Sequence, residues 1–198
     1  MSGTEVELRR EMSRPQLGGF LRSLLREPFA VGAQAPSSRF LASLMVADMR
    51  PGSRVIELGP GTGAVTRAIL GAGVRADDLI LIEQNEDFAE LLTRRFPDTT
   101  VVKANAISLC RHIDPDSEPA DFVVSGLPLL LFPARAKVRL LSQVFKSLRD
   151  DGCLYQFTYG GRCPVSRSLL RSLGLKASLV KFTPFNVPPA FVYRIVRA

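Results

Sequence analysis

The chain has 198 residues, 46% of them apolar, and carries a formal net charge of +7. A chain of this length fits one domain and can bury a sizeable core, which excludes an intrinsically disordered protein. The longest apolar stretch, residues 122–134, is broken by glycine and proline and is too short to span a membrane. The N-terminus shows no secretory signal, and three scattered cysteines favour a reducing cytoplasm over a disulfide framework.

The charge is distributed unevenly along the chain. Residues 151–198 carry seven basic side chains and one acidic side chain, whereas residues 51–150 carry twelve and thirteen. This asymmetry indicates an anionic partner, either nucleic acid or lipid headgroups. A solvated surface that keeps the protein soluble is the alternative interpretation.

Two helices are expected before the first strand. An apolar stripe within residues 17–25, with arginines to its side, predicts an amphipathic helix that ends before Pro28. Ser37 or Ser38 is expected to cap a second helix, which the Pro51-Gly52 pair ends.

Strands and helices then alternate, which predicts a parallel sheet with right-handed crossovers. The expected strands are 54–58, 79–83, 100–103 and 122–125, and the expected helices are 64–70, 87–96 and 134–148. The turn signal Asp150-Asp151-Gly152 should precede another strand, 154–159. Two strand-like runs, 176–185 and 191–196, lie too close in sequence for a crossover helix and should pair antiparallel.

The clearest chemistry lies in the segment Glu57-Leu58-Gly59-Pro60-Gly61-Thr62-Gly63, a strand end followed by a glycine-rich turn and a helix start. Glycines allow a ligand to approach the backbone closely, and the free N–H groups of a helix N-terminus suit an anionic group. Glu83 ends the next strand, where a carboxylate can accept hydrogen bonds from ribose hydroxyls. Because Gly59, Gly61 and Ala64 also satisfy a dinucleotide-binding pattern, these residues alone do not decide which nucleotide cofactor binds.

The string E-x-G-x-G-x-G resembles motif I of the class I methyltransferases, and Glu83 resembles their motif II acid. The resemblance implies S-adenosylmethionine as cofactor, no metal, and Glu57 near the methionyl amino group. It also implies an adenine contact at Asn105, where most relatives have Asp, and an acceptor-binding motif IV at Ser125-Gly126-Leu127-Pro128. The implied cofactor-binding residues are Ser37, Ser38, Glu57, Gly59, Gly61, Thr62, Gly63, Glu83, Gln84, Asn105, Ala106 and Ser125. The implied fold is α/β, Rossmann-like, with a mostly parallel seven-stranded sheet, an antiparallel last strand and N-terminal helices.

Motif IV bears on the methyl acceptor. Adenine methyltransferases of nucleic acids carry an Asn or Asp that accepts from the amino nitrogen, and an aromatic residue that stacks on the base. Here Gly126 and Leu129 stand at those two places. An rRNA adenine N6-dimethyltransferase is therefore kept only as an alternative, beside a non-catalytic cofactor-binding module.

From Val31 to Arg197 the chain resembles the bacterial phospholipid N-methyltransferases. The resemblance is carried by residues 31–38, the glycine motif, and the segments 127–133, 156–160 and 186–190. It implies methylation of the headgroup amine of phosphatidylethanolamine and its mono- and dimethylated forms, giving phosphatidylcholine. It also implies a cytoplasmic protein, peripheral on the inner face of an anionic membrane, with no nucleic-acid partner, in which an amphipathic segment 1–30 precedes a methyltransferase domain 31–198.

Substrate residues follow from the chemistry of the amine. A tyrosine hydroxyl can orient the nitrogen, and Tyr159, which ends the expected strand after motif IV, is the predicted catalytic residue. Phe132 and Phe185 are expected to wall the site, and Arg167 or Arg194 to bind the lipid phosphate. A half-buried core tyrosine and surface arginines are the alternatives. Neither the oligomeric state nor the number of methylations is predicted.

Overall fold

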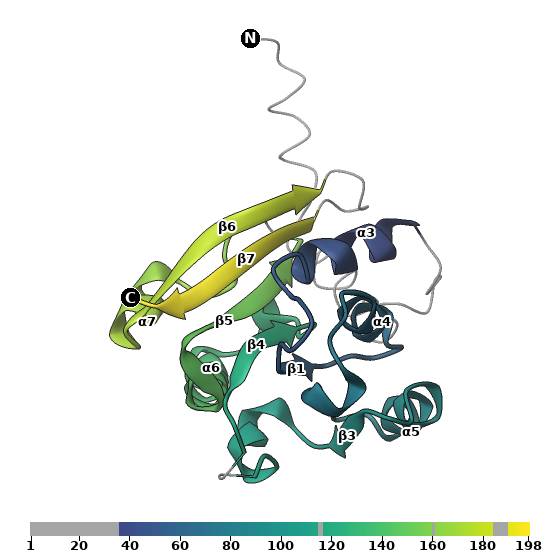
Figure 1. Ribbon diagram of the computed structural model, residues 1–198. Helices are drawn as coiled ribbons and strands as arrows, with labels where there is room; N and C mark the ends of the chain where they lie inside the picture. The colour runs from purple at the N-terminus through teal and green to yellow at the C-terminus, as the bar shows by residue number, and fades with distance from the viewer. Residues whose placement is uncertain (1–35, 115–116, 160, 184–189) are drawn as a thin grey trace, which may run out of the picture.

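The structure is a computed structural model that describes residues 36–114, 117–159, 161–183 and 190–198. Its centre is a seven-stranded sheet with the order β3-β2-β1-β4-β5-β7-β6, covered by helices on both faces (Figure 1). The strands are β1 (Val55–Leu58), β2 (Leu79–Glu83), β3 (Thr100–Lys103), β4 (Ala120–Ser125), β5 (Leu148–Thr158), β6 (Leu175–Thr183) and β7 (Ala190–Arg197). The helices are α3 (Pro36–Met45), α4 (Ala64–Gly71), α5 (Glu86–Arg95), α6 (Ala134–Ser147) and α7 (Arg167–Ser172), with 3₁₀ turns η1 (Ala76–Asp78), η2 (Ala106–Arg111) and η3 (Leu129–Leu131). The predicted fold class is confirmed.

The first five strands of the sheet are parallel. β1 pairs with β2 on one side and with β4 on the other, β2 pairs with β3, and β4 pairs with β5. The ends of these strands therefore meet along one side of the sheet, which we call the carboxyl edge. The chain order reverses between β1 and β4, and such a switch point is where parallel α/β sheets form their ligand sites.

The predicted antiparallel pair is confirmed. β7 runs antiparallel to both β5 and β6, and Phe191 of β7 pairs with Thr158 on one side and Phe182 on the other. Because Thr158 ends β5, the end of β6 also reaches the carboxyl edge. The register shifts between Leu179 and Lys181, so β6 has a bulge at Val180.

The expected turn before the fifth strand is wrong, because residues 150–152 lie inside β5. Ala120 pairs with Leu148 but Phe122 pairs with Cys153, so the extra residues of β5 bulge out of the ladder. Arg149 holds the bulge by ion pairs with Asp121 and Asp151. A Cβ on Gly152 would lie 3.0 Å from the Arg149 carbonyl oxygen, which explains the glycine. The turn-forming residues therefore mark a bulge and not a strand start.

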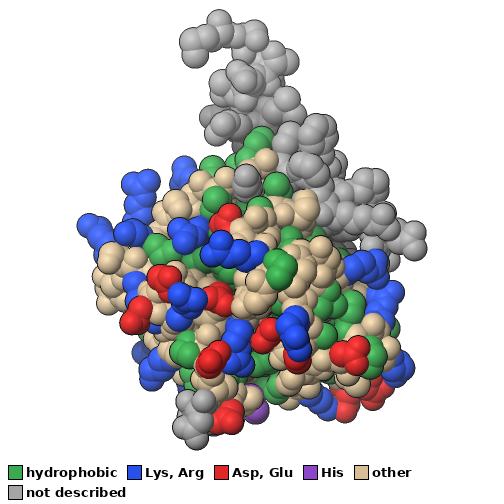
Figure 2. All heavy atoms as spheres, viewed as in Figure 1, with side chains coloured by type: hydrophobic (Ala, Val, Ile, Leu, Met, Phe, Trp, Pro, Cys, Tyr) green, Lys and Arg blue, Asp and Glu red, His purple; other side chains and the backbone are tan. Residues whose placement is uncertain are grey.

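Two apolar clusters hold the layers together. Met45, Ile69 and Leu92 join α3, α4 and α5 to one face of the sheet. Leu141 and Leu170 join α6 and α7 to the other face. Among the described residues, no helix is both long and apolar enough to cross a membrane. Figure 2 shows Lys and Arg side chains along the upper left of the molecule, where Figure 1 places β6 and β7.

The start of α3 corrects a second expectation. The helix begins at Pro36, so Ser37 and Ser38 lie within its first turn and do not cap it from outside. Proline suits that first position because its φ is already helical and the missing N–H would be unpaired there anyway. The predicted amphipathic helix within residues 1–30 lies outside the described residues.

Candidate cofactor and acceptor site

The glycine-rich turn joins β1 to α4 at the switch point. Gly59, Gly61 and Gly63 have φ values of +68°, +55° and +82°, which glycine adopts without the strain that a side chain would bring. A Cβ on Gly59 would lie 2.8 Å from the Leu127 side chain, and one on Gly63 would lie 2.5 Å from the Phe96 ring. The turn is therefore packed tightly against its neighbours on both sides.

Glu83 ends β2 beside this turn and is 8% exposed. Its Oε2 accepts a hydrogen bond from the Gly61 backbone N–H at 3.1 Å, and its Oε1 accepts one from the Asn85 N–H at 2.8 Å. Each carboxylate oxygen can still accept a further hydrogen bond. The carboxylate is thus fixed at the carboxyl edge in a form that can accept from two ribose hydroxyls.

Glu57 lies in β1 and is 2% exposed. Its Oε2 accepts from the Thr66 hydroxyl at 2.6 Å, and it makes no ion pair with a described residue. Burial raises the pKa of Glu57 to about 8; the hydrogen bond from Thr66 opposes this rise, and the charge of Glu83 adds to it. Nearby, the Thr62 hydroxyl oxygen is buried without a hydrogen-bond partner among the described residues.

These groups fit an amino-acid ligand. A buried carboxylate without a counter-charge is expensive, so a cationic group beside Glu57 would be favourable. The unpartnered Thr62 hydroxyl can donate to a carboxylate. The methionyl part of S-adenosylmethionine carries both an ammonium and a carboxylate, and Glu83 can take its ribose.

Four further predicted cofactor residues follow the carboxyl ends of β2, β3 and β4: Gln84, Asn105, Ala106 and, at the end of β4, Ser125. Asn105 follows β3, and its Oδ1 accepts from the Ile107 N–H at 2.9 Å, which fixes the side chain and leaves Oδ1 able to accept once more. It lines a pocket of about 500 Å³ with Ile107 and Ser108. Ala106 and Ser125 are buried, whereas Gln84 is exposed.

Motif IV has no room for a side chain where adenine methyltransferases carry their Asn or Asp. A Cβ on Gly126 would lie 2.7 Å from the Gly59 carbonyl oxygen. The Gly126 N–H donates to the Leu58 carbonyl oxygen at 2.8 Å, so the hydrogen bonding between β4 and β1 extends one residue beyond the end of β4. Leu129, at the place of the stacking aromatic, is 1% exposed. Both departures from the adenine motif are therefore built into the packing.

No role was predicted for Gln156 from the sequence. It is fully buried in β5 beside Ser125, and its Nε2 donates to the carbonyl oxygens of Leu127 and Phe157, both at 2.9 Å. Its Oε1 is buried without a partner among the described residues. Gln156 thus ties the motif IV loop to β5. The available signal was a single polar side chain in the apolar run 153–157.

Tyr159 follows β5 at the carboxyl edge and packs edge-on against Phe157, with ring centroids 5.4 Å apart. Burial raises the pKa of its hydroxyl, which keeps it neutral at physiological pH. The hydroxyl makes no hydrogen bond to a described residue. Phe132 is half-buried just after η3, at the end of motif IV. Phe185 lies outside the described residues.

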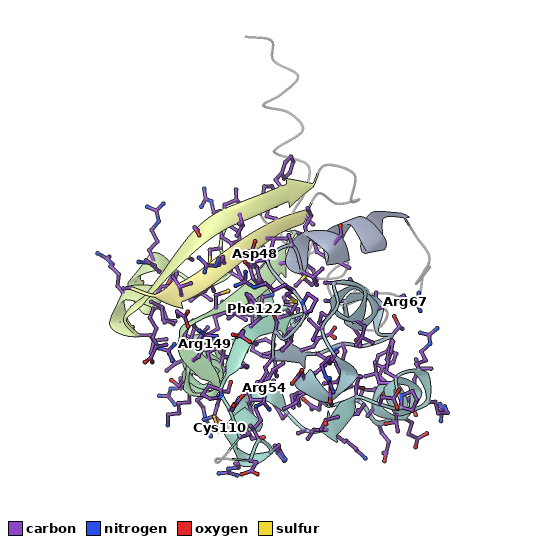
Figure 3. The ribbon with its side chains drawn as sticks, viewed as in Figure 1. Asp48, Arg54, Arg67, Cys110, Phe122 and Arg149 are labelled. Carbon is purple, nitrogen blue, oxygen red and sulfur yellow. The ribbon has the colours of Figure 1, made fainter. Side chains whose placement is uncertain are left out.

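The two candidate arginines do not share a site. Arg194, on β7, pairs in register with Tyr155, and a hydrogen bond with Cys153 raises its pKa. The Tyr155 hydroxyl donates to Asp48, which Figure 3 shows between β7 and the centre of the sheet. Arg167 instead begins α7, is exposed, and lines a separate groove between α7 and β6.

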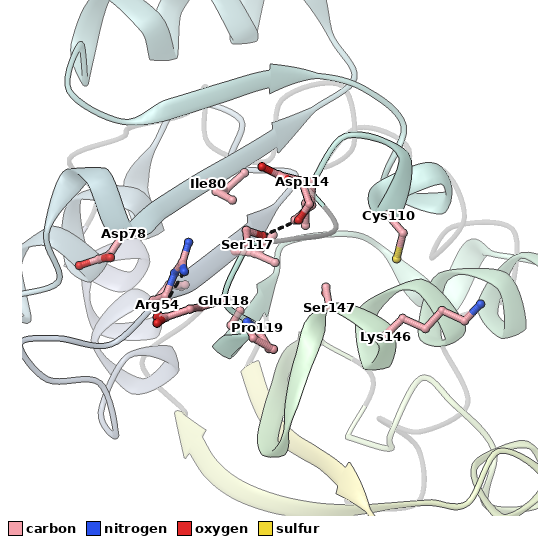
Figure 4. Close-up of a pocket in the computed structure, with 14 residues that line it drawn as sticks. Arg54, Asp78, Ile80, Cys110, Asp114, Ser117, Glu118, Pro119, Lys146 and Ser147 are labelled. Carbon is pink, nitrogen blue, oxygen red and sulfur yellow. Dashed lines mark hydrogen bonds and ion pairs between the residues drawn. The ribbon is translucent and has the colours of Figure 1, made fainter.

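A cavity of about 300 Å³ lies at the opposite edge of the sheet (Figure 4). Arg54, Asp78 and Pro119, which lie just before β1, β2 and β4, line it together with Lys146. It is remote from the glycine turn and has no part in the cofactor site. No group of three or more His, Cys, Asp or Glu side chains that could hold a metal ion is found among the described residues.

Comparison with known proteins places this geometry in context. The chain is 33% identical over 181 residues to an ornithine lipid N-methyltransferase of Singulisphaera acidiphila, covering 88% of this chain and 92% of that protein. It is 30% identical over 113 residues to a mitochondrial ribosomal RNA small subunit methyltransferase of Arabidopsis thaliana, covering 56% of this chain but 29% of that protein. No protein-family profile matches.

The fold also occurs in solved methyltransferase structures. The 1,6-didemethyltoxoflavin-N1-methyltransferase of Burkholderia thailandensis, solved with bound 1,6-didemethyltoxoflavin and S-adenosylhomocysteine, superposes with a TM-score of 0.65. The sequence identity is 17%, and the match covers 91% of this chain and 86% of that one. At this identity the likeness concerns the fold.

Proposed function

Since this chain is an S-adenosylmethionine-dependent methyltransferase of the family that includes the Singulisphaera acidiphila ornithine lipid N-methyltransferase, we propose that it methylates a lipid amine. The acceptor we propose is the headgroup amine of phosphatidylethanolamine and of its mono- and dimethylated forms, and the final product is phosphatidylcholine. Ornithine lipid is a second candidate, because the relative carries that name and its headgroup also presents a primary amine.

The observation that carries the proposal is the contact at Gly126. Its Cβ position is filled by the Gly59 carbonyl oxygen, so no amide or carboxylate can stand there to accept from an adenine amino group. With Leu129 buried, no side chain at the second motif position is free to stack on a base. These features argue against rRNA adenine dimethylation, and the partial match to rRNA methyltransferases spans only a fraction of their length.

The cofactor would be held by residues at the carboxyl edge. Glu57 would face the methionyl ammonium, Glu83 would accept from the ribose hydroxyls, and Asn105 would contact the adenine. When bound, S-adenosylmethionine supplies an electrophilic methyl group on a sulfonium. The glycine turn lets that ligand approach the backbone closely.

The protein's main tasks are to position the acceptor and to exclude water. A primary ammonium has a pKa of about 10, so presenting the free lone pair at pH 7 costs about 4 kcal/mol. Partly apolar walls such as Phe132 lower that cost by disfavouring the charged form. Tyr159 would orient the nitrogen through its hydroxyl, and aromatic faces would hold the cation that forms.

The protein would work at the cytoplasmic, anionic face of a membrane as a peripheral protein. The amphipathic pattern within residues 1–30 supports an interfacial anchor, since its apolar side chains can lie among acyl chains with arginines near the headgroups.

One assay separates the candidates. Methyl transfer from labelled cofactor would be measured into phosphatidylethanolamine, its methylated forms, ornithine lipid and rRNA, with the products separated. Label in phosphatidylcholine supports the proposal. Label only in ornithine lipid would identify that lipid as the substrate in place of phosphatidylethanolamine. Label only in RNA would overturn the lipid assignment. Cofactor binding without transfer to any of these acceptors would support a non-catalytic module. The Gly61→Val variant, in which the cofactor's path is blocked, is the matched control.

A further inference from the structure

A groove of about 990 Å³ lies between α7 and β6, away from the cofactor residues. We call it the α7–β6 groove. Its lining includes the four basic residues Arg162, Arg167, Arg171 and Lys176, and no acidic residue. Apolar side chains, among them Leu170 and Leu175, also line it.

The charge of this groove is not neutralised within the protein. None of its four basic side chains makes an ion pair or a side-chain hydrogen bond with a described residue, and all four are exposed. From residue 151 onward the chain carries one acid, Asp151, which pairs with Arg149. By contrast, Arg54, Arg75 and Arg94 elsewhere on the protein pair with carboxylates. The concentration of unpaired positive charge points to an anionic ligand.

Apolar exposure adjoins the groove. Exposed large hydrophobic side chains, among the described residues, occur on two elements, β6 and η3. On β6 they are Leu179 at 51%, Val180 at 37% and Phe182 at 50%, and on η3 they are Leu130 and Leu131. Leu179 also lines the groove. Because Phe182 lies level with the end of β5, the apolar end of β6 projects at the carboxyl edge, beside the acceptor site.

We propose that the α7–β6 groove and the apolar end of β6 form a docking surface for an anionic lipid bilayer, in which the basic side chains contact lipid phosphates and Leu179, Val180 and Phe182 enter the interface. The choice of a lipid surface rests on the proposed function. Nucleic acid would match the charge but not the exposed aliphatic side chains. A second copy of this chain would match the apolar edge strand, but it would bring the same positive charge against itself.

A fluorescence experiment tests the apolar half of this surface. The chain contains no tryptophan, so Phe182→Trp gives it a single indole, at the end of β6. Vesicles of zwitterionic and anionic lipid with brominated acyl chains should quench this fluorescence and shift it to the blue. The control is Phe88→Trp on α5, which packs against β2 and β3, at the end of the strand order away from β6. Its fluorescence should stay unquenched. Equal quenching of the two variants, or none, overturns the proposal.

A charge experiment tests the basic half. Each basic side chain near an anionic surface contributes about a factor of five in binding, so Arg167→Gln with Arg171→Gln should weaken vesicle binding about 25-fold at low salt. The control, Arg67→Gln with Arg94→Gln, removes the same net charge from α4 and α5, and Figure 3 shows Arg67 on the side away from β6. The control should lose less than about threefold. Equal losses would mean that the net charge of the protein alone determines vesicle binding, and would overturn the proposal that the groove is the docking surface.

The other partners and the proposed function are separated by further readouts. A groove variant that loses RNA affinity without any bilayer quenching would identify a nucleic-acid surface, and a concentration-dependent blue shift without lipid would identify self-association; both overturn the proposal. Methyl transfer to lipid amines in detergent micelles needs no bilayer docking. Micellar activity without quenching refutes the docking surface alone, whereas quenching without methylation of any lipid amine refutes the proposed function alone.

Discussion

Replacing Glu57 with glutamine should make the protein more stable at alkaline pH and its cofactor binding weaker. The pKa of Glu57 is raised from 4.5 to about 8 because burial disfavours the charged carboxylate. The folded state therefore holds this proton more tightly than the unfolded chain does. The stabilisation is fully present below about pH 4.5 and is lost as the pH rises through about 8. A rise of this size is worth roughly 5 kcal/mol in the free energy of unfolding.

In Glu57→Gln this dependence disappears, because the amide has the same shape and no charge. The variant and the wild type should have similar free energies of unfolding at pH 5. At pH 9 the variant should be more stable by up to roughly 5 kcal/mol. Urea unfolding at both pH values measures the difference. Glu90→Gln, which changes an exposed carboxylate on α5, is the control and should show no such gain.

Cofactor binding should change in the opposite direction. A carboxylate lost from beside an ammonium weakens a charge-assisted hydrogen bond, which is worth about 2 kcal/mol or roughly 30-fold in affinity for S-adenosylhomocysteine. Below pH 8 the wild type must also release a proton from Glu57 when the ammonium binds, so its calorimetric heat should depend on the buffer. Wild-type heats that do not depend on the buffer, together with unchanged stability of the variant at pH 9, would refute this reasoning.

Other substitutions test the remaining roles. Glu83→Ala should weaken S-adenosylhomocysteine binding by about 1–3 kcal/mol in calorimetry, and unchanged affinity would remove Glu83 from the site. Tyr159→Phe should lower kcat and leave cofactor affinity intact, whereas full activity in Tyr159→Ala would identify a core tyrosine. Gln156→Met should lower kcat about tenfold by releasing the motif IV loop, with little loss of stability because the unpartnered Oε1 is removed too; unchanged turnover would contradict this. Deleting residues 1–27 should weaken cosedimentation with anionic liposomes, and equally tight binding would contradict an N-terminal anchor.

Most of the parallel part of the sheet could be predicted from local sequence signals. The strands before and after the glycine turn are short apolar runs bounded by Gly, Pro and polar residues, and such punctuation is readable without tertiary information. The turn itself was equally clear, because three glycines within five residues, between a strand and a helix, predict a tight turn with an accessible backbone. The cofactor residues at the ends of β1 and β2 were predicted from the glycine turn and from the carboxylate at the end of the next strand. Those after β3 and β4 were expected only from the resemblance to the class I methyltransferases.

The errors arose where distant residues decide the local structure. The Asp150-Asp151-Gly152 signal is that of a turn, but Arg149 contacts Asp121, which is remote in sequence, and the segment becomes a bulge. Gln156 gave no signal beyond its polarity, because its partners are carbonyl oxygens that only the fold brings near. At Gly126 the sequence showed a missing Asn, and the structure supplies the reason in the contact with Gly59.

The separation of charge across the carboxyl edge bears on how a zwitterionic headgroup would be oriented. The buried acid Glu57 and the carboxylate of Glu83 lie at β1 and β2, whereas the unpaired basic side chains lie at α7 and β6, on the other side of β4 and β5. Tyr159 follows β5, between these two regions. A phosphate drawn toward the basic side would leave the amine of the same headgroup directed toward Tyr159 and the cofactor. The variant with Arg167→Gln and Arg171→Gln should therefore lower the turnover of phosphatidylethanolamine in anionic vesicles more than the control with Arg67→Gln and Arg94→Gln does, and equal losses would contradict this orientation.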